Sequence, residues 1–252
     1  MIKNISILLA AIILLSTGSC KKEEPTDNTN ITPPVIANAK VKLIVHQFVS
    51  TSRTDTFTYD GDGRIISRNV SDGTRDSYTY PAGQVVQEYY NSSGVLQTTR
   101  TYFLNANNRA DSMVVQGSNT NRASYKYDAA GYLISSKNYN SSNTLNFIYS
   151  SIWENGNLKE QYTTTPTNEI YSHTVNNYDV DHKNSAGGKN TGLEFLGKSS
   201  ANPQTEQYYQ SMPSTLYIYR YEYTFDSEGR IATVTSYNGQ GEFSNSMTYT
   251  YY

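Results

Sequence analysis

Three side chains suited to metal binding stand close together in the sequence, at Asp179, Asp181 and His182. Side chains alternate along an extended chain, so both carboxylates would lie on one side and suit Ca²⁺, while the imidazole would admit a transition metal. However, Asp179 stands where other turns of this chain place an Asp that accepts backbone hydrogen bonds. We therefore expect a turn here rather than a metal site, and we predict no cofactor.

A second candidate is a row of alternating aromatic residues, which we call the aromatic ladder. It consists of Tyr217, Tyr219, Tyr221, Tyr223 and Phe225. Rings that face solvent would form a platform on which sugars stack, with Trp153 as a further member, whereas rings that face inward would be core. Because five exposed rings would leave a large apolar patch in water, the inward orientation is the better alternative. The tyrosines of the ladder remain the candidate ligand-binding residues.

The sequence carries no recognisable catalytic motif. Its three histidines are His46, His173 and His182, and none forms a known catalytic spacing with a nucleophile. Gly-x-Ser-x-Gly, His-Glu-x-x-His and P-loop motifs are missing from the sequence. A net charge of −2 provides no sequence-wide positive field for a polyphosphate. We expect a protein that is not an enzyme and does not bind nucleic acid.

The first twenty residues have the layout of an export signal. Lys3 precedes an apolar stretch that is too short to span a bilayer as a helix, and small residues lead to Cys20. Residues 15–20, Leu-Ser-Thr-Gly-Ser-Cys, resemble the lipobox of bacterial lipoproteins, although Thr17 stands where that motif usually has Leu. The resemblance implies that residues 1–19 are removed and that Cys20, the only cysteine, is lipidated. An ordinary secretory signal is the alternative.

Residues 20–39 combine charged residues, Asn, Thr and three prolines, which indicates a flexible tether behind the lipidated cysteine. Within it, residues 21–24, Lys-Lys-Glu-Glu, are similar to signals that send some Gram-negative lipoproteins to the outer face of the outer membrane. We therefore expect a lipid anchor in the outer membrane of a Gram-negative bacterium, on either face.

Residues 40–252 read as one β domain. Aromatic and small polar residues alternate with a period of two, which favours strands. Three turns share one template, in which Asp60, Asp128 or Asp226 precedes a glycine by three residues. The Asp accepts backbone hydrogen bonds and the glycine adopts positive φ, so each copy predicts a hairpin turn.

The segment 57–65, Phe-Thr-Tyr-Asp-Gly-Asp-Gly-Arg-Ile, has echoes at 125–133 and 223–231. These segments resemble the YD repeat of RHS-type proteins and of related Gram-negative lipoproteins of uncharacterised function. The resemblance covers nearly the whole chain from residue 40 and implies a continuous row of hairpins. Long members of that family wind such hairpins into a shell around a toxin, and this chain has too few repeats to enclose one.

These features predict an all-β fold, an antiparallel meander of about 12–14 strands at about 24 residues per hairpin. A sheet this wide must curl, so we expect an open half-barrel or spiral, with a closed barrel or sandwich as alternatives. The segment 184–207 breaks the rhythm and should leave the sheet as a long loop, with a short helix at its apolar residues 193–196. Polar residues on alternate positions argue against a transmembrane barrel.

Together, these inferences predict a lipid-anchored protein of the cell envelope that acts as a structural or interaction module, through its curved sheet and the 184–207 loop. The alternative is a surface protein that binds glycans with exposed tyrosines. The expected partners are the membrane, through the lipid, and envelope proteins or glycans.

Overall fold

The computed structural model describes residues 39–117, 121–212 and 215–252, and within them the chain forms sixteen antiparallel strands and two short helices. The strands are β1 (Val41–Phe48), β2 (Ser52–Tyr59), β3 (Ile65–Val70), β4 (Arg75–Thr79), β5 (Gln84–Tyr90), β6 (Leu96–Leu104), β7 (Ala110–Gly117), β8 (Asn121–Tyr127), β9 (Leu133–Tyr139), β10 (Leu145–Glu154), β11 (Asn157–Thr164), β12 (Ile170–Tyr178), β13 (Gln204–Ser211), β14 (Thr215–Phe225), β15 (Ile231–Asn238) and β16 (Phe243–Tyr251). The helices are α1 (Gly188–Thr191) and the 3-10 helix η1 (Glu194–Leu196).

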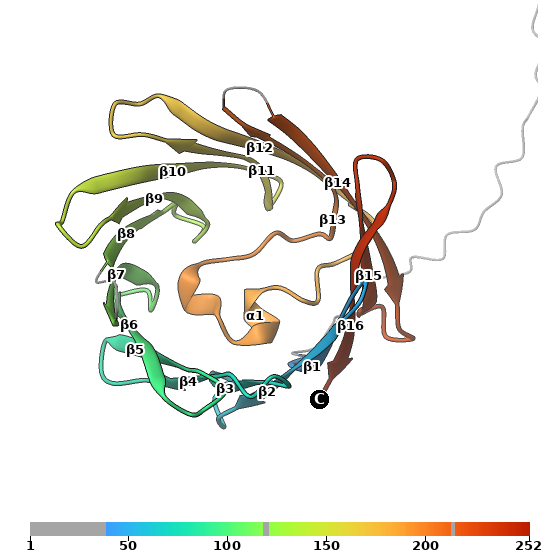
Figure 1. Ribbon diagram of the computed structural model, residues 1–252, viewed down its shortest axis with the longest axis horizontal. Helices are drawn as coiled ribbons and strands as arrows, with labels where there is room; N and C mark the ends of the chain where they lie inside the picture. Colours follow the sequence, from blue (N-terminus) through green and yellow to red (C-terminus); the bar gives the residue numbers. More distant parts are fainter. Residues whose placement is uncertain (1–38, 118–120, 213–214) are drawn as a thin grey trace, which may run out of the picture. The chain divides into compact units, whose positions relative to one another are not determined.

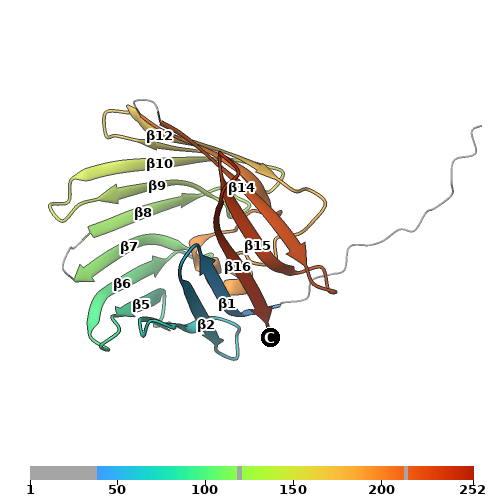
Figure 2. The ribbon, with the colours of Figure 1, turned by 45° about the vertical axis from the view of Figure 1, so that its right-hand side comes forward.

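The strands pair in sequence order and the last pairs with the first, so the sheet closes into a barrel (Figure 1, Figure 2). Val45 of β1 lies opposite Thr248 of β16 on one side and Thr54 of β2 on the other. The predicted open half-barrel of 12–14 strands is therefore wrong, and the closed barrel given as an alternative is confirmed. Sixteen strands form because the hairpin period of about 24 residues continues through the whole domain outside the segment between β12 and β13, which makes room for eight hairpins. Closure pairs the two edges that an open sheet would leave exposed.

The predicted turn chemistry is confirmed. In the β2–β3 turn, Asp60 Oδ1 accepts hydrogen bonds from the backbone amides of Asp62 and Arg64, at 3.0 and 2.9 Å. Gly63 has φ +75°, which a residue with a side chain rarely adopts. Asp226 repeats the arrangement in the β14–β15 turn. Because alternate turns of a meander lie at the same end, both of these turns belong to one rim of the barrel.

Polar side chains pair across the outward face of the wall on β13, β14 and β15. Arg220 of β14 forms an ion pair with Glu206 of β13 across 3.3 Å, and the hydroxyls of Thr224 and Thr233 are 2.6 Å apart. Both β14 residues occupy positions that alternate with the aromatic ladder, so the ladder faces inward. The predicted alternation, with polar side chains outward, is confirmed on this strand.

Residues 179–203, between β12 and β13, fold into the barrel (Figure 1), and we call this segment the plug. The predicted long loop at 184–207 does leave the sheet, but it ends earlier than predicted, since β13 already begins at Gln204, and it lies inside the barrel. The 3-10 helix η1 forms at the apolar residues, as predicted. No helix in the described residues is long and apolar enough to cross a membrane.

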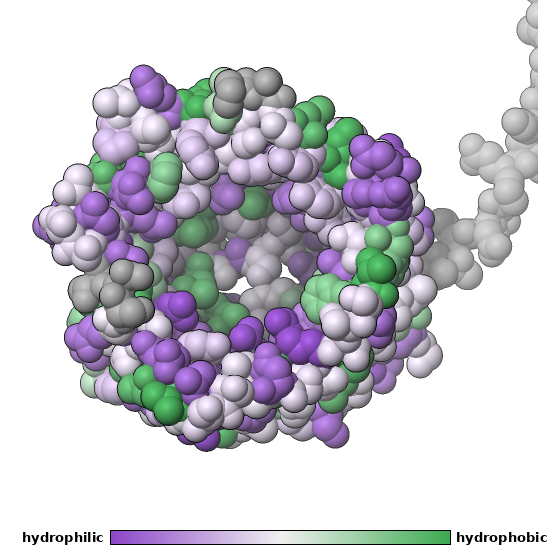
Figure 3. All heavy atoms as spheres, in the orientation of Figure 1, coloured by the Kyte–Doolittle hydropathy of each residue, from purple (hydrophilic) through white to green (hydrophobic). Residues whose placement is uncertain are grey.

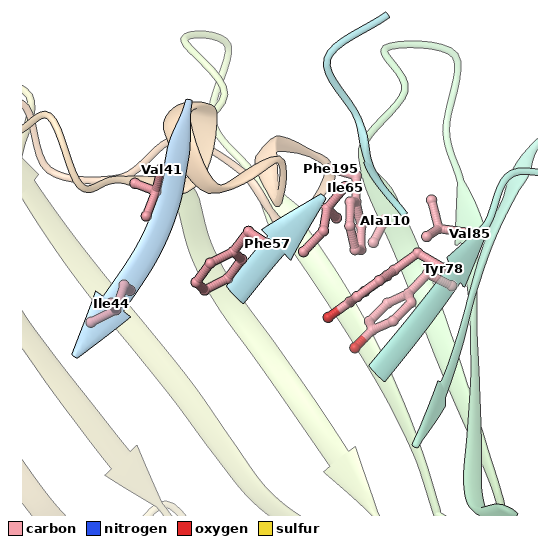
Figure 4. Packing of buried hydrophobic residues seen from close by; sticks show 9 residues of the cluster. Val41, Ile44, Phe57, Ile65, Tyr78, Val85, Ala110 and Phe195 are labelled. Atoms are coloured by element: carbon pink, nitrogen blue, oxygen red, sulfur yellow. The ribbon is translucent and has the colours of Figure 1, made fainter. Parts of the chain in front are cut away.

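An apolar cluster joins the plug to one side of the wall. Phe195 of η1 is 8% exposed and packs edge-on against Tyr102 of β6, with ring centroids 5.1 Å apart. In Figure 4, Phe195 lies beside Ile65 and Ala110. The buried members are Val41, Ile44, Phe57, Ile65, Tyr78, Val85, Tyr102, Ala110 and Phe195. Removing these apolar side chains of the plug from water favours its position inside the barrel.

Hydrogen bonds hold the plug at two further places. The buried Ser185 Oγ accepts a hydrogen bond from the backbone amide of Ile231 at 2.7 Å. Asn202 and Asn157 form a reciprocal pair, in which Asn157 Nδ2 donates to Asn202 Oδ1 and the Asn202 amide donates to Asn157 Oδ1, both at 3.0 Å. The plug therefore contacts the wall on several sides.

Candidate functional site

The plug lies near one rim of the barrel and leaves a hollow on its other side. Its backbone amides at Lys198 and Ala201 donate to the carbonyls of Gly131 and Gly156, which stand at turns on that rim. The first described residue, Ala39, precedes β1 at the same rim. The space-filling view shows the ring hollowed at its centre (Figure 3). We call this rim the plugged end, the opposite rim the mouth, and the hollow the lumen.

The aromatic ladder lines the lumen wall from the mouth to the plug. Tyr217, near the mouth, is 46% exposed, and its ring lies 6.0 Å from that of Tyr209 on β13. At the other end, the hydroxyl of Tyr223 donates to the backbone oxygen of Gln204 at 2.6 Å, and burial raises the pKa of Tyr223. The ladder is neither an outer platform nor closed core, because Tyr217 is exposed and the other four rings are half-buried.

A cavity of about 270 Å³ lies between the ladder and the lumen side of the plug. Among its lining residues, Tyr221, Tyr223 and Tyr249 supply rings, and Asn184, Asn202 and Gln204 supply amides. The amides are mostly engaged within the protein. In the described residues, however, the hydroxyl of Tyr221 and the side-chain oxygen of Gln204 have no hydrogen-bond partner. Rings with a few free polar groups are the usual lining of small-molecule sites.

Two buried carboxylates form a charged band on another part of the lumen wall. Asp55, 3% exposed, lies 3.4 Å from His46 Nε2 and 3.1 Å from Arg53 Nε. Asp76, also 3% exposed, lies 3.0 Å from Arg68. Pairing with cations is what makes such burial tolerable. The sequence interpretation missed this band. A signal was present, since Asp55 and Asp76 each stand two residues before an aromatic residue that faces inward, Phe57 and Tyr78, and alternate residues of a strand share a face.

Trp153 does not join the aromatic ladder. It lies at the end of β10, where its ring packs against that of Tyr132 at an interplanar angle of 30°, with centroids 4.5 Å apart. Its Nε1 donates to the backbone oxygen of Leu133 at 2.9 Å. The indole is thus engaged by its own neighbours and is not one of the residues that line the cavity beside the ladder.

Asp179, Asp181 and His182 form a turn at the start of the plug. Asp179 Oδ1 accepts a hydrogen bond from the Asp181 amide at 3.0 Å, and its Oδ2 lies 2.7 Å from His182 Nδ1. The imidazole stacks on Phe225 with centroids 4.0 Å apart. In the described part of the chain, no three His, Cys, Asp or Glu residues gather as metal ligands would. Cys20, the predicted lipidation site, lies outside the described residues.

The fold is that of solved porin-like proteins. One from Bacteroides uniformis has a TM-score of 0.62 and 15% sequence identity, covering 84% of this chain and 98% of its own. Another from Bacteroides vulgatus has a TM-score of 0.61 and 14% identity, covering 85% of this chain and 99% of its own. A scan of protein-family models finds no match, and a search of curated proteins finds no similar sequence. These likenesses show a shared fold.

The YD-repeat resemblance is therefore wrong, because no family model supports it and the similar structures are porin-like. The recurring segments have a simpler origin. Each places an aromatic side chain inward at the end of a strand and an Asp turn directly after it, as Tyr59 and Asp60 do. Strand alternation and Asp turns on one rim are thus enough to produce the recurring segments.

Proposed function

We propose that this protein is a lipid-anchored, non-enzymatic protein of the cell envelope that binds a saccharide inside its barrel. The observation that carries the proposal is the cavity between the ladder and the plug, in which tyrosine rings and amides face one space. Sugars present apolar faces that stack on aromatic rings and hydroxyls that need hydrogen-bond partners. The Tyr221 hydroxyl and the Gln204 side-chain oxygen would supply such partners.

The ladder extends this site toward the mouth. Alternate residues of a strand follow one another along one face, so the path from Tyr217 to Tyr223 spans about 20 Å. A saccharide of several units would enter beside the exposed Tyr217 and reach the cavity at Tyr221. Arg53 and Arg68, which are much more exposed than the carboxylates they pair with, would give the lumen further polar contacts.

The outer wall supports a barrel that stands in water. A wall embedded in lipid carries an apolar band flanked by aromatic girdles. Here the outward positions hold cross-strand polar pairs, including Arg220 with Glu206, and His173 with Glu160 at 3.0 Å. Desolvating such groups in hydrocarbon would be unfavourable. Attachment would instead come from the lipid on Cys20.

The chain connectivity fits such an anchor. Ala39, the first described residue, stands at the plugged end, so an anchor on the chain before it would attach the barrel by that end and leave the mouth at the far end. A flexible tether of about 20 residues has an end-to-end distance of roughly 25 Å. The outer membrane of a Gram-negative bacterium remains the proposed location, and the Bacteroides origin of the porin-like structures is consistent with it.

A glycan array tests the saccharide proposal. The full chain in detergent should bind a subset of glycans, and the Tyr219→Ala/Tyr221→Ala variant should lose that binding. A Tyr162→Ala/Tyr208→Ala variant is the matched control, because both tyrosines face outward and donate to Glu160 and Glu206. If the folded protein binds no glycan, the proposal fails, and a partner should be sought among envelope proteins by crosslinking.

The anchor is tested separately. Cys20→Ala should abolish incorporation of a labelled fatty acid and release the protein from the membrane fraction. Cys20→Ala protein that stays in the membrane fraction with unchanged labelling would contradict the proposed lipidation.

A further inference from the structure

A second cavity, of about 590 Å³, opens at the plugged end, on the face of the plug opposite the lumen. It lies between the plug and the turns β2–β3, β4–β5 and β6–β7, as its lining residues Gly63, Gly83 and Asn108 show. Its volume falls in the range of small-molecule sites, about 300–1,000 Å³. Because the plug separates it from the ladder, it is independent of the proposed saccharide site.

Cations outnumber carboxylates around this cavity. The charged lining residues are Lys40, Arg64, Arg109, Lys189, Asp62 and Glu194. Arg64 is neutralised, since its guanidinium contacts Asp60 at 2.7 Å and Asp62 at 3.1 Å. Lys40 Nζ donates to the backbone oxygen of Lys189 at 2.7 Å, and burial lowers the pKa of Lys40 while the charge of Glu194 opposes that shift.

Arg109 and Lys189 are left without an ion-pair partner among the described residues. Arg109 belongs to the turn before β7, on the wall, while Lys189 belongs to α1, on the plug. Two cations without an ion pair thus line one cavity from two different parts of the fold, and they outnumber the one lining carboxylate, Glu194, that also has no ion pair among the described residues. Guanidinium and ammonium groups together suit an oxyanion, which the guanidinium can bind through two parallel hydrogen bonds.

The floor of the cavity is apolar. Val85 and Phe195, 1% and 8% exposed, line it together with Leu104. We propose that this cavity binds a small organic ligand with a carboxylate or phosphate group, whose oxyanion contacts Arg109 and Lys189 and whose body rests on the apolar floor. Such a ligand would bridge the wall and the plug, so its binding would also stabilise the plug.

Calorimetric titration of the full chain in detergent tests this site. The probes are benzoate, a carboxylate on an apolar ring, its uncharged analogue benzamide, and inorganic phosphate, an oxyanion without a body. Benzoate should bind about tenfold more tightly than benzamide, since only benzoate makes charge-assisted hydrogen bonds. Tighter binding of phosphate than of benzoate would assign the site to the anion alone and overturn the role of the apolar floor.

Two substitutions locate the binding. Arg109→Gln and Lys189→Gln should each weaken benzoate binding about tenfold. Lys198→Gln is the matched control, because Lys198 is a plug lysine that lies over Tyr132 and does not line the cavity. The exposed Lys189 can change without loss of packing, which keeps the test valid if Arg109→Gln unfolds.

Three results would overturn the proposal: no binding of benzoate or phosphate at millimolar concentrations, equal binding of benzoate and benzamide, or binding that neither substitution weakens. Tyr221→Ala should leave benzoate binding unchanged, and this separates the result from that of the saccharide proposal.

Discussion

Phe195 of the plug and Tyr102 of β6 meet edge to face, with ring centroids 5.1 Å apart, although they are far apart in the sequence. Edge-to-face contact is a favourable arrangement of two aromatic rings. It joins a segment between two hairpins to the opposite part of the closed wall. This contact belongs to the apolar cluster that joins the plug to the wall.

Phe195→Ala should lower the free energy of unfolding by about 3–5 kcal/mol, because it removes a large buried ring and leaves a cavity. Urea unfolding of the full chain measures the change. Phe103→Ala is the control, since Phe103 is 39% exposed, and it should change stability by less than about 1 kcal/mol. Equal effects of the two substitutions would show that the plug does not pack as described.

Ser185→Ala should destabilise the fold by about 1–3 kcal/mol, because the buried amide of Ile231 loses the hydroxyl to which it donates. The same measurement on Ser142→Ala, in an exposed turn, should show a change within about 0.5 kcal/mol. The interpretation is contradicted if Ser185→Ala is as stable as the unsubstituted chain.

Alkaline pH should destabilise the barrel. Burial raises the pKa of Tyr80, Tyr127 and Tyr249 to about 12. The unfolded chain releases these protons near pH 10 and the folded chain holds them, so stability is complete below pH 10 and falls as the pH rises toward 12. Ultraviolet absorbance of phenolate, followed together with circular dichroism, should show a late class of tyrosines that ionises as the fold is lost.

The other tyrosines of the 24 include exposed ones that ionise near pH 10, so the buried tyrosines should give a separate step at higher pH. A single titration step near pH 10 for all of them, with the native circular dichroism spectrum retained, would contradict the burial of these three rings.

The strands, turns and polar outer face were predictable because each depends on neighbouring residues. Alternation along Tyr217 to Phe225 determines which side chains share a face, and Asp60 with Gly63 determines a turn. These features need no knowledge of the rest of the chain.

Closure and the plug were not predictable in the same way, because they depend on residues far apart in sequence. Whether Val45 meets Thr248 depends on the accumulated twist and the register of sixteen strands. The apolar residue Phe195 in a Gly- and Ser-rich segment was a signal that the segment is buried, but it did not indicate where. Asp55, likewise, is recognisable as inward only once its neighbour Phe57 is known to be core.

The central claim is that the lumen, and not the outer wall, binds a saccharide. Calorimetric titration of the tightest-binding array glycan into the unsubstituted chain, Tyr221→Ala and Tyr208→Ala tests it directly. The Tyr221→Ala variant loses a stacking ring and a hydroxyl, so its affinity for the glycan should be about tenfold weaker. The Tyr208→Ala variant should bind the glycan like the unsubstituted chain. Equal affinity of Tyr221→Ala and the unsubstituted chain, or a loss confined to Tyr208→Ala, would contradict it.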